Sequence, residues 1–420
     1  MIRSLRTGIT GLRSNQLALD VIGNNIAGVN TIGFKRSRVL FEDALAQRLG
    51  TGSRLTGSSS SGVSNVGNGV TVASVDQIWS QGAFEYTNLP TDLAIAGDGF
   101  FLASSPRGNV LTRAGAFSFD SEGYLTSPAG LRIQGWQASD DGTIRTGALE
   151  DIRIDPSRTA NPARTDQMSI TGNLSADRDI DVPADPDFEP LTMSSVIYDG
   201  TGIAHTAVLE VAKTAAGEWT VTKASIAGDD SAVPPVPETV LTVTGGPMTF
   251  DADGNQTGGG SVTLGGTFPD GSALDIDVDL SEITQFGGSS TATVASQNGS
   301  SSGDLIDYGF DRDGQLVLAF SNGVRTPAAQ IAVGIVQNPD GLEQVGDGYY
   351  DTTSISGDVQ VGRAGAEIRT GIVSGALESS NVDLAQEFTD MIVAQRGYQA
   401  NARVVTTSDE LLQETVSLKR

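Results

Sequence analysis

The sequence predicts a mainly β protein with an α-helix at each end. Three features support this prediction. Gly is abundant, at 52 residues, while charged residues make up only 18% of the chain, a composition typical of short strands joined by turns. Both ends carry apolar residues at spacings of three and four, and short alternating apolar runs fill the middle. With 420 residues, the chain is long enough for two or three domains.

The first predicted helix lies at the N-terminus. Apolar, amide and glycine positions recur there at spacings of three and four, which is the spacing of one face of an α-helix. The repeat continues over several turns and has the form of a heptad pattern. Its members are Ile2, Leu5, Ile9, Leu12, Gln16, Leu19, Gly23 and Ile26.

A longer helix is predicted at the C-terminus, from about 384 to 416. Two columns recur there every seven positions: Leu384, Met391, Tyr398, Val405 and Leu412 form one, and Phe388, Gln395, Ala402, Asp409 and Val416 form the other. A helix of this length would extend about 50 Å. Asp383 stands directly before it as a candidate N-cap, and Gln386 is the candidate capping-box partner.

Neither terminal stripe has an apolar partner within its own end of the chain. We therefore expect the two helices to pair with each other, with other copies of the chain, or both, as a coiled coil. The alternative is that each is an ordinary amphipathic helix packed on a domain. The predicted assembly interface consists of Leu5, Ile9, Leu12, Leu19, Ile26, Leu384, Phe388, Met391, Tyr398, Val405, Leu412 and Val416.

The segments between the helices differ in composition. Residues 50–69 hold twelve Gly or Ser in twenty positions, which indicates a linker or an extended arm. From 70 to 155 short alternating runs are broken by Gly-containing turns, and this pattern returns after 301. Pro clusters mark another β segment between them, which indicates a domain inserted into a domain.

The predicted organisation is nested, and it places both chain ends together. A helical coiled-coil domain comprises 1–30 and 376–420, and 31–69 form a linker or extended arm. An inner β domain comprises 70–155 and 301–375, and it encloses an inserted outer β domain over 156–300.

Charge and the scarcity of reactive side chains argue against several functions. The net charge of -25 repels phosphate backbones and anionic membrane surfaces, so we expect no nucleic-acid partner. No stretch of 18 or more apolar residues exists, so we also expect no membrane insertion. There is no cysteine, and the single histidine, His205, stands in a run typical of a strand. We expect no enzyme, no cofactor and no metal site. Turnover that depends on His205 would be evidence for an enzyme.

Motifs at both ends and in the first β segment resemble the flagellar rod and hook protein family. The N-terminal motif includes Asn24, Asn25, Gly33 and Phe34. The motif of the first β segment includes Gly97, Gly99 and Phe100, and the C-terminal motif includes Asn381, Asp383, Gln395, Arg396, Gly397 and Tyr398. Gly28 departs from the family, which usually has Asn there, and we expect it to loosen the turn after the first helix.

Within this family, rod members are shorter and generally lack a large inserted β domain, so the chain is similar to the hook members. The resemblance implies a structural subunit that polymerises with itself into a curved, flexible tube, which transmits torque from motor to filament. It implies rod proteins, a hook cap and hook–filament junction proteins as partners.

The resemblance also implies an extracellular location after export through the flagellar type III apparatus. The apolar positions near the N-terminus are interrupted by polar residues, so we expect no cleaved signal peptide. Two alternatives stay open at this point. A distal rod subunit would share both terminal motifs, and a secreted β-rich adhesin would share the β domains and the acidity.

Overall fold

The chain divides into two compact units. The computed structural model describes residues 2–44, 47–48, 65–66, 68–139, 142–180, 190–228 and 237–417. The first unit comprises Met1–Asp155, Tyr308–Leu318 and Thr326–Arg420, and the second comprises Pro156–Asp307 and Ala319–Arg325. The finer partition into four segments stays a prediction. Neither helix in the described part of the chain combines the length and the hydropathy needed to cross a membrane.

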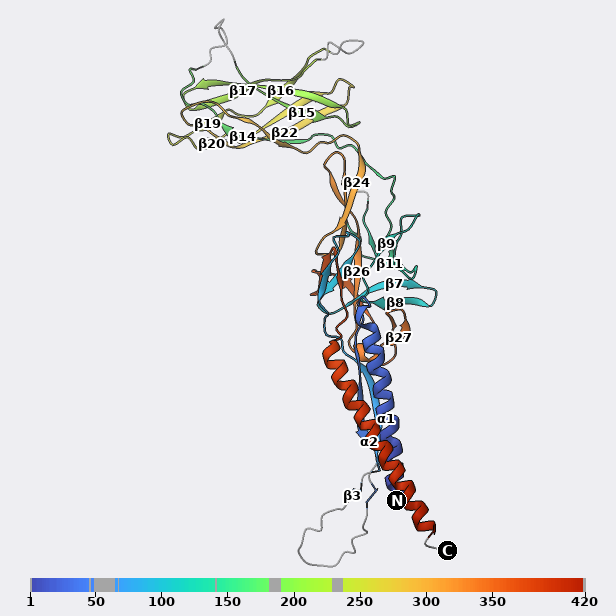
Figure 1. Ribbon diagram of the computed structural model, residues 1–420. Coiled ribbons are helices and arrows are strands. Elements are labelled where there is room, and N and C mark those ends of the chain that lie inside the picture. The colour runs from blue at the N-terminus through green and yellow to red at the C-terminus, as the bar shows by residue number, and fades with distance from the viewer. Residues whose placement is uncertain are drawn as a thin grey trace, which may run out of the picture. The chain divides into compact units, whose positions relative to one another are not determined.

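Two antiparallel helices form one end of the first unit (Figure 1). Helix α1 spans Ile2–Ala27 and continues into the 3-10 turn η1, Gly28–Asn30, while α2 spans Leu384–Ser417. Both helices were predicted, and the mainly β fold with terminal helices is confirmed.

The start of α2 is fixed by Asp383. Its Oδ1 accepts hydrogen bonds from the backbone N–H groups of Ala385 at 2.9 Å and Gln386 at 3.3 Å, which confirms the predicted N-cap. The predicted capping box is wrong, because the Gln386 amide donates to Asp390 instead, at 3.1 Å to either carboxylate oxygen. These two residues lie one helical turn apart, which favours such a pair.

A two-stranded ribbon lies along α1. Strand β1, Ser37–Asp43, pairs antiparallel with β4, Val70–Gln77. Part of the predicted linker is therefore a strand, because its β-branched and aromatic side chains favour extended backbone. Most of the Gly- and Ser-rich stretch lies outside the described residues.

The body of the first unit is an antiparallel sheet. Its strand order includes β26-β11-β7-β8-β28-β27. Phe100, Leu102, Leu111, Trp136 and Tyr350 are buried together in its core. Besides β1 and β4, the strands that lie wholly in this unit are β2 (Gln47–Arg48), β3 (Asn65–Val66), β5 (Phe84–Tyr86), β6 (Leu93–Ala96), β7 (Phe100–Ser105), β8 (Gly108–Thr112), β9 (Ser118–Phe119), β10 (Leu125–Thr126), β11 (Arg132–Gln137), β12 (Glu150–Asp151), β27 (Glu343–Gly346), β28 (Tyr349–Asp351), β29 (Gln360–Arg363), β30 (Gly371–Ser374) and β31 (Ala376–Glu378), with the 3-10 turn η2 (Pro339–Gly341).

The second unit has its own sheet and core. Its strand order is β15-β16-β17-β18-β21-β22-β14-β23, and Trp219 and Phe268 are among its buried residues. The strands are β13 (Thr159–Ala160), β14 (Gln167–Asn173), β15 (Leu191–Tyr198), β16 (Ala204–Ala215), β17 (Glu218–Ile226), β18 (Thr239–Thr244), β19 (Met248–Phe250), β20 (Gln256–Gly258), β21 (Ser261–Thr267), β22 (Ala273–Thr284) and β23 (Thr293–Gln297). Strands β24 (Gly303–Phe310), β25 (Gln315–Phe320) and β26 (Arg325–Ile335) each have residues in both units.

Candidate assembly site

The contact between α1 and α2 is made largely by small side chains. The hydroxyl oxygens of Ser4 and Ser408 lie 3.2 Å apart. A Cβ atom added at Gly11 would lie 2.6 Å from Nδ2 of Asn401, and one at Gly397 would lie 2.8 Å from Oδ1 of Asn15. These glycines let the two helices approach closely, and we call this contact the seam.

The predicted columns of α2 only partly coincide with the seam. Met391, Val405 and Leu412 are half-buried there, while Leu384 and Tyr398 are about 40% exposed. The second column of the seam is shifted by one residue from the predicted one, to Glu387, Ala394, Asn401 and Ser408. As a result Phe388, Gln395 and Asp409 are exposed and Ala402 is half-buried, while the Val416 side chain lies outside the description.

The predicted stripe of α1 is likewise not the seam. Gly8, Gly11, Ser14, Ala18 and Asn25 are buried in this helix. The stripe of large apolar residues stays partly exposed: Leu5, Leu12, Leu19 and Ile26 are half-buried, and Ile9 is exposed. A heptad pattern is recognised by its large apolar side chains, whereas the close contact between α1 and α2 has room only for small ones. The stripes thus remain a prediction for contacts beyond the single chain.

The two asparagines of the terminal motifs join the helices to the β body. Asn25 accepts from the backbone N–H of Ser37 at 2.9 Å, and it donates to Oε2 of Glu387 at 3.1 Å. Asn381 accepts from the backbone N–H of Arg36 at 2.8 Å and donates to the carbonyl oxygen of Ile78 at 2.7 Å. The neighbouring Asn24 is exposed. The buried amide of Asn25 and the half-buried amide of Asn381 therefore hold together segments that are far apart in the chain.

A buried ion cluster connects the three motif segments. Lys35 Nζ lies 2.6 Å from Oε1 of Glu378, and both side chains are fully buried. Arg113 Nη1 lies 3.4 Å from Oε2 of the same carboxylate. Oε1 also accepts from the backbone N–H of Gly82 at 2.9 Å. We call Lys35, Arg113 and Glu378 the ion cluster.

Burial sets the electrostatics of the ion cluster. Desolvation lowers the pKa of Lys35 and of Arg113, and the Glu378 carboxylate opposes both shifts. Two cations thus share one carboxylate away from water. Since a buried charge is stabilised only by its partners, Glu378 is the residue on which this junction depends. In the sequence, the ion cluster was visible only as charged residues within the motifs. None of its three residues was among the site residues predicted from the sequence.

The other motif residues are divided between the body and α2. Phe100 is buried and its ring centroid lies 5.2 Å from that of Trp79. Gly97 and Gly99 both have positive φ, in the turn between β6 and β7. Gln395 and Arg396 are exposed on α2.

Gly28 does not loosen the turn after α1, contrary to the expectation. It is buried, and its carbonyl oxygen accepts from the Thr31 backbone N–H at 3.0 Å. A Cβ atom there would lie 2.6 Å from the ring of Phe34. The missing side chain makes room for this aromatic ring, so the turn is closely packed.

His205 lies on strand β16 of the second unit, just after the turn that contains Asp199. Its Nε2 lies 3.1 Å from Oδ2 of the buried Asp199. Oδ1 of Asp199 accepts from the Thr201 backbone and hydroxyl groups at 2.8 Å and from the Ile203 backbone at 3.0 Å. These bonds give both residues a structural role, in agreement with the strand position predicted for His205.

The second unit will lose stability in acid as Asp199 becomes protonated. Burial alone would raise the pKa of Asp199, but hydrogen bonds from Thr201, His205 and Ile203 lower it from 3.8 to about 2. Because the folded-state pKa lies below the unfolded one, this contribution is complete above about pH 4 and is lost as the pH falls towards 2. We expect the thermal midpoint of the second unit to fall over that range. In Asp199→Asn the thermal midpoint should be lower at neutral pH, and it should fall less between about pH 4 and pH 2 than in the unaltered chain. If the variant and the unaltered chain showed the same dependence of the midpoint on pH, Asp199 would not be the group responsible.

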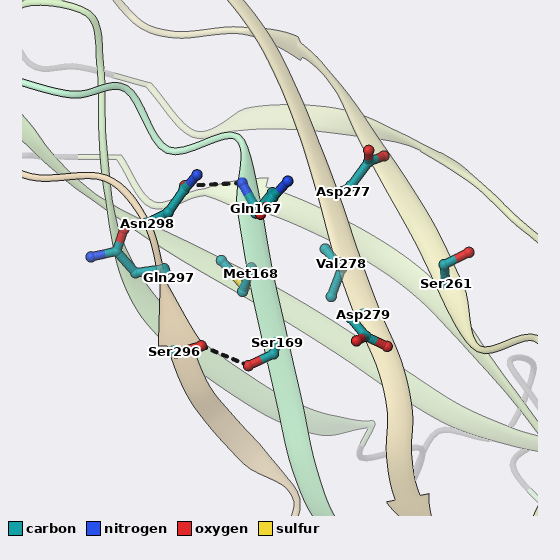
Figure 2. A pocket seen from close by; sticks show the side chains of 10 residues that line it. All are labelled: Gln167, Met168, Ser169, Ser261, Asp277, Val278, Asp279, Ser296, Gln297 and Asn298. Carbon is teal, nitrogen blue, oxygen red and sulfur yellow. Dashed lines mark hydrogen bonds between the residues drawn. The ribbon is translucent and has the colours of Figure 1, made fainter. Parts of the chain in front are cut away.

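A groove with a mixed polar and apolar lining crosses the sheet of the second unit (Figure 2). Its volume is about 520 Å³, and its lining comes mainly from β14, β21, β22 and β23. The hydroxyl oxygens of Ser169 and Ser296 lie 2.8 Å apart across two of these strands. The carboxylates of Asp277 and Asp279 lie on the adjacent strand.

Models of flagellar protein families match most of the chain. The model described as "Flagella basal body rod protein" matches residues 5–35, and "Flagellar basal body rod FlgEFG protein C-terminal" matches 373–418. "Flagellar hook protein FlgE/F/G D1 domain" matches 94–185, and "Flagellar basal body protein FlaE D2 domain" matches 173–300. Antiparallel terminal helices joined to a β body by the motif residues thus define a structural protein of the flagellar rod and hook class.

Full-length relatives narrow this class. The flagellar hook protein FlgE of Borreliella burgdorferi is 38% identical over 100% of both chains, and that of Treponema pallidum is 33% identical over 100% of both. That of Salmonella typhimurium is 30% identical over 99% of this chain and 100% of its own. The chain belongs to the flagellar hook protein family, as a structural subunit of the hook.

A solved structure supports the fold. The crystal structure of Helicobacter pylori flagellar hook protein FlgE2 superposes with a TM-score of 0.50 and 17% sequence identity. It covers 70% of this chain and 100% of its own.

Proposed function

We propose that copies of this chain polymerise through the faces of α1 and α2 that lie outside the seam. The product is the wall of a curved, flexible tube that transmits torque from the motor to the filament. The observation that supports this most directly is the exposure of large apolar side chains on α2. Phe388 is 51% exposed, Val393 64% and Leu411 52%. Apolar surface of this kind marks a site of protein contact.

The energetics favour an array over an isolated pair. Complete burial of a large apolar side chain contributes about 1.5–3 kcal/mol, and half of each side chain is already covered. The four most exposed large apolar residues in the described part of α2 would therefore contribute roughly 4 kcal/mol. These residues are Phe388, Ile392, Val393 and Leu411. Association costs about 4–15 kcal/mol. One contact is thus close to neutral, and several contacts per subunit are needed for a stable polymer.

The second unit supplies a surface suited to bending. A tube that bends during rotation needs outer contacts that can exchange. Apart from Met168 and Val278, the residues that line the groove of Figure 2 carry hydroxyl, amide or carboxylate groups. These groups can replace one another's hydrogen bonds or bond to water. We propose that contacts between neighbouring second units are of this polar kind.

The location and the partners extend the same proposal. The chain is exported through the flagellar type III apparatus without cleavage and acts outside the cell. It joins rod proteins below and junction proteins above, and a hook cap assists its assembly. It is not an enzyme. The support is the family membership, the net charge of -25 and the absence of cysteine.

Replacing Phe388 by Asp tests the proposal. We expect the purified variant to remain monomeric in sedimentation at concentrations where the unaltered chain forms tubes. Its critical concentration should rise at least tenfold, because a charge would be buried in an apolar contact. The side chain is about half exposed in the single chain, so the circular dichroism spectrum should not change.

Val240→Asp is the matched control. Val240 is 63% exposed on β18 of the second unit, and the change has the same chemistry away from the helices. We expect this control to polymerise. Tubes that form from the Phe388 variant at the unaltered concentration would refute the role of the helix faces.

A further inference from the structure

Charged residues form one column on the outer face of each helix. On α1 the column is Arg6, Arg13 and Asp20, and on α2 it is Arg396, Arg403 and Glu410. In both columns the residues are spaced by seven and the charges read plus, plus, minus. Residues spaced by seven share one face of an α-helix. We call these sets the α1 column and the α2 column.

Both columns point away from the seam. Arg13 lies two positions after the buried Gly11, and Glu410 lies two positions after the buried Ser408. Two positions correspond to about 200° around an α-helix. The same holds for Asp20, which follows the buried Ala18 by two positions. The charges therefore lie on the side of each helix opposite to the contact within the chain.

The columns are exposed and lie beside uncovered apolar residues. All six charged side chains are exposed, and in the described part of the chain none has an ion-pair partner within 4.0 Å. Ile9 and Leu17 flank the α1 column, and Ile392 and Leu411 flank the α2 column; all four are exposed. Each outer face thus combines apolar side chains with unpaired charges.

We propose that the α1 column of one copy pairs with the α2 column of a second copy, with Arg13 opposite Glu410 and Asp20 opposite Arg403. This pairing rests on the proposed polymerisation through the outer helix faces and specifies its partner and register. The two faces are different surfaces of one chain, so the contact is heterologous and repeats without closing. In a tube whose copies share one polarity, α1 of one copy runs antiparallel to α2 of the next.

The order of the charges selects this register. Antiparallel pairing with Arg13 opposite Glu410 places Asp20 opposite Arg403, and no like charges face each other. A shift by one heptad in one direction keeps two attractive pairs, Arg6 with Glu410 and Asp20 with Arg396. It also places Arg13 opposite Arg403, a repulsion that the proposed register does not have. A shift in the other direction places Asp20 opposite Glu410. Since like charges in contact are costly, both shifted registers are disfavoured while the apolar residues alone would distinguish them poorly.

Reciprocal charge reversals in separate chains test the pairing. Arg13→Glu and Glu410→Arg should each raise the critical concentration of polymerisation about tenfold, because each turns an attraction into a repulsion. A one-to-one mixture of the two variant proteins should polymerise near the unaltered concentration. In an alternating copolymer, each contact joins either the two substituted side chains or the two original ones, and both combinations have opposite charges.

The mixture separates pairing between copies from pairing within one chain. If Arg13 and Glu410 met within one chain, the mixture would remain defective, and that result would overturn the proposal. Raising the salt concentration should weaken polymerisation of the unaltered chain but assist each single variant, because salt screens both attraction and repulsion. Arg107→Glu, on an exposed turn of the β body, is the control and should polymerise normally.

The outcomes also separate this inference from the proposed function. If the unaltered chain forms tubes and both reversed variants form them equally well, the charge pairing is wrong and polymerisation through the helix faces stands. If the unaltered chain forms no tubes and Phe388→Asp has no effect on assembly in cells, the proposed function itself fails, and the charge pairing fails with it.

Discussion

Glu378→Gln will destabilise the first unit by about 3–5 kcal/mol. The substitution keeps the shape of the side chain but removes the one carboxylate that lies between Lys35 and Arg113. Both cations are buried, and Nε of Arg113 already has no hydrogen-bond partner in the described part of the structure. We expect denaturant unfolding of the first unit to begin at a lower concentration, and cells with this variant to lack hooks.

A matched substitution distinguishes burial from charge. Glu122 is 68% exposed and lies 3.6 Å from Arg132, so Glu122→Gln removes an exposed ion pair. Its expected cost is about 0–1 kcal/mol. Equal effects at the two positions would contradict the central place of the ion cluster.

A second substitution can recover part of the lost stability. Lys35→Met in the Glu378→Gln background removes one of the two uncompensated cations. Because the two side chains interact directly, the free energies of unfolding should not add, and the double variant should be more stable than the sum of the single changes predicts. Strict additivity would mean that the two groups act independently.

The sequence predicted the helices well because their signals are local. Asp383 marks the first residue of α2 through its hydrogen bonds to the following backbone, and the heptad columns continue nearly to the observed end. Strands such as β6 and β7 were indicated by apolar runs beside Gly-containing turns. Each of these signals lies within about ten residues of what it specifies.

The seam and the ion cluster were missed because their signals are not local. A heptad pattern is assigned from the positions of large apolar residues, whereas the two helices approach each other at the small residues Gly11, Ala18 and Ala394. Lys35 and Glu378 are 343 positions apart, and charged residues in a sequence are usually exposed. Nothing near either residue distinguishes a buried charge from a solvated one.

Gly33→Ala will separate the terminal helices from the β body. Gly33 has a φ of 68°, a conformation that costs an alanine about 1–2 kcal/mol. A Cβ atom there would also lie 2.8 Å from the backbone nitrogen of Ala114 and 2.8 Å from the carbonyl carbon of Arg113. Backbone atoms cannot move aside as a flexible side chain can, so we expect a total cost of about 3 kcal/mol or more.

Gly130→Ala isolates the two components of this cost. Gly130 has a φ of 79°, but no heavy atom lies within 4 Å of the added Cβ position. We therefore expect only the conformational cost of about 1–2 kcal/mol in that variant. The amides of α1 and α2 should exchange their hydrogens faster in Gly33→Ala than in Gly130→Ala. The reason is that Gly33 donates its backbone N–H to the carbonyl oxygen of Glu378 at 2.8 Å, and a shift of the backbone at Gly33 would weaken this bond. Equal protection in the two variants would mean that the close approach of Gly33 to Arg113 does not hold the helices to the body, and that the amides of Asn25 and Asn381 are sufficient.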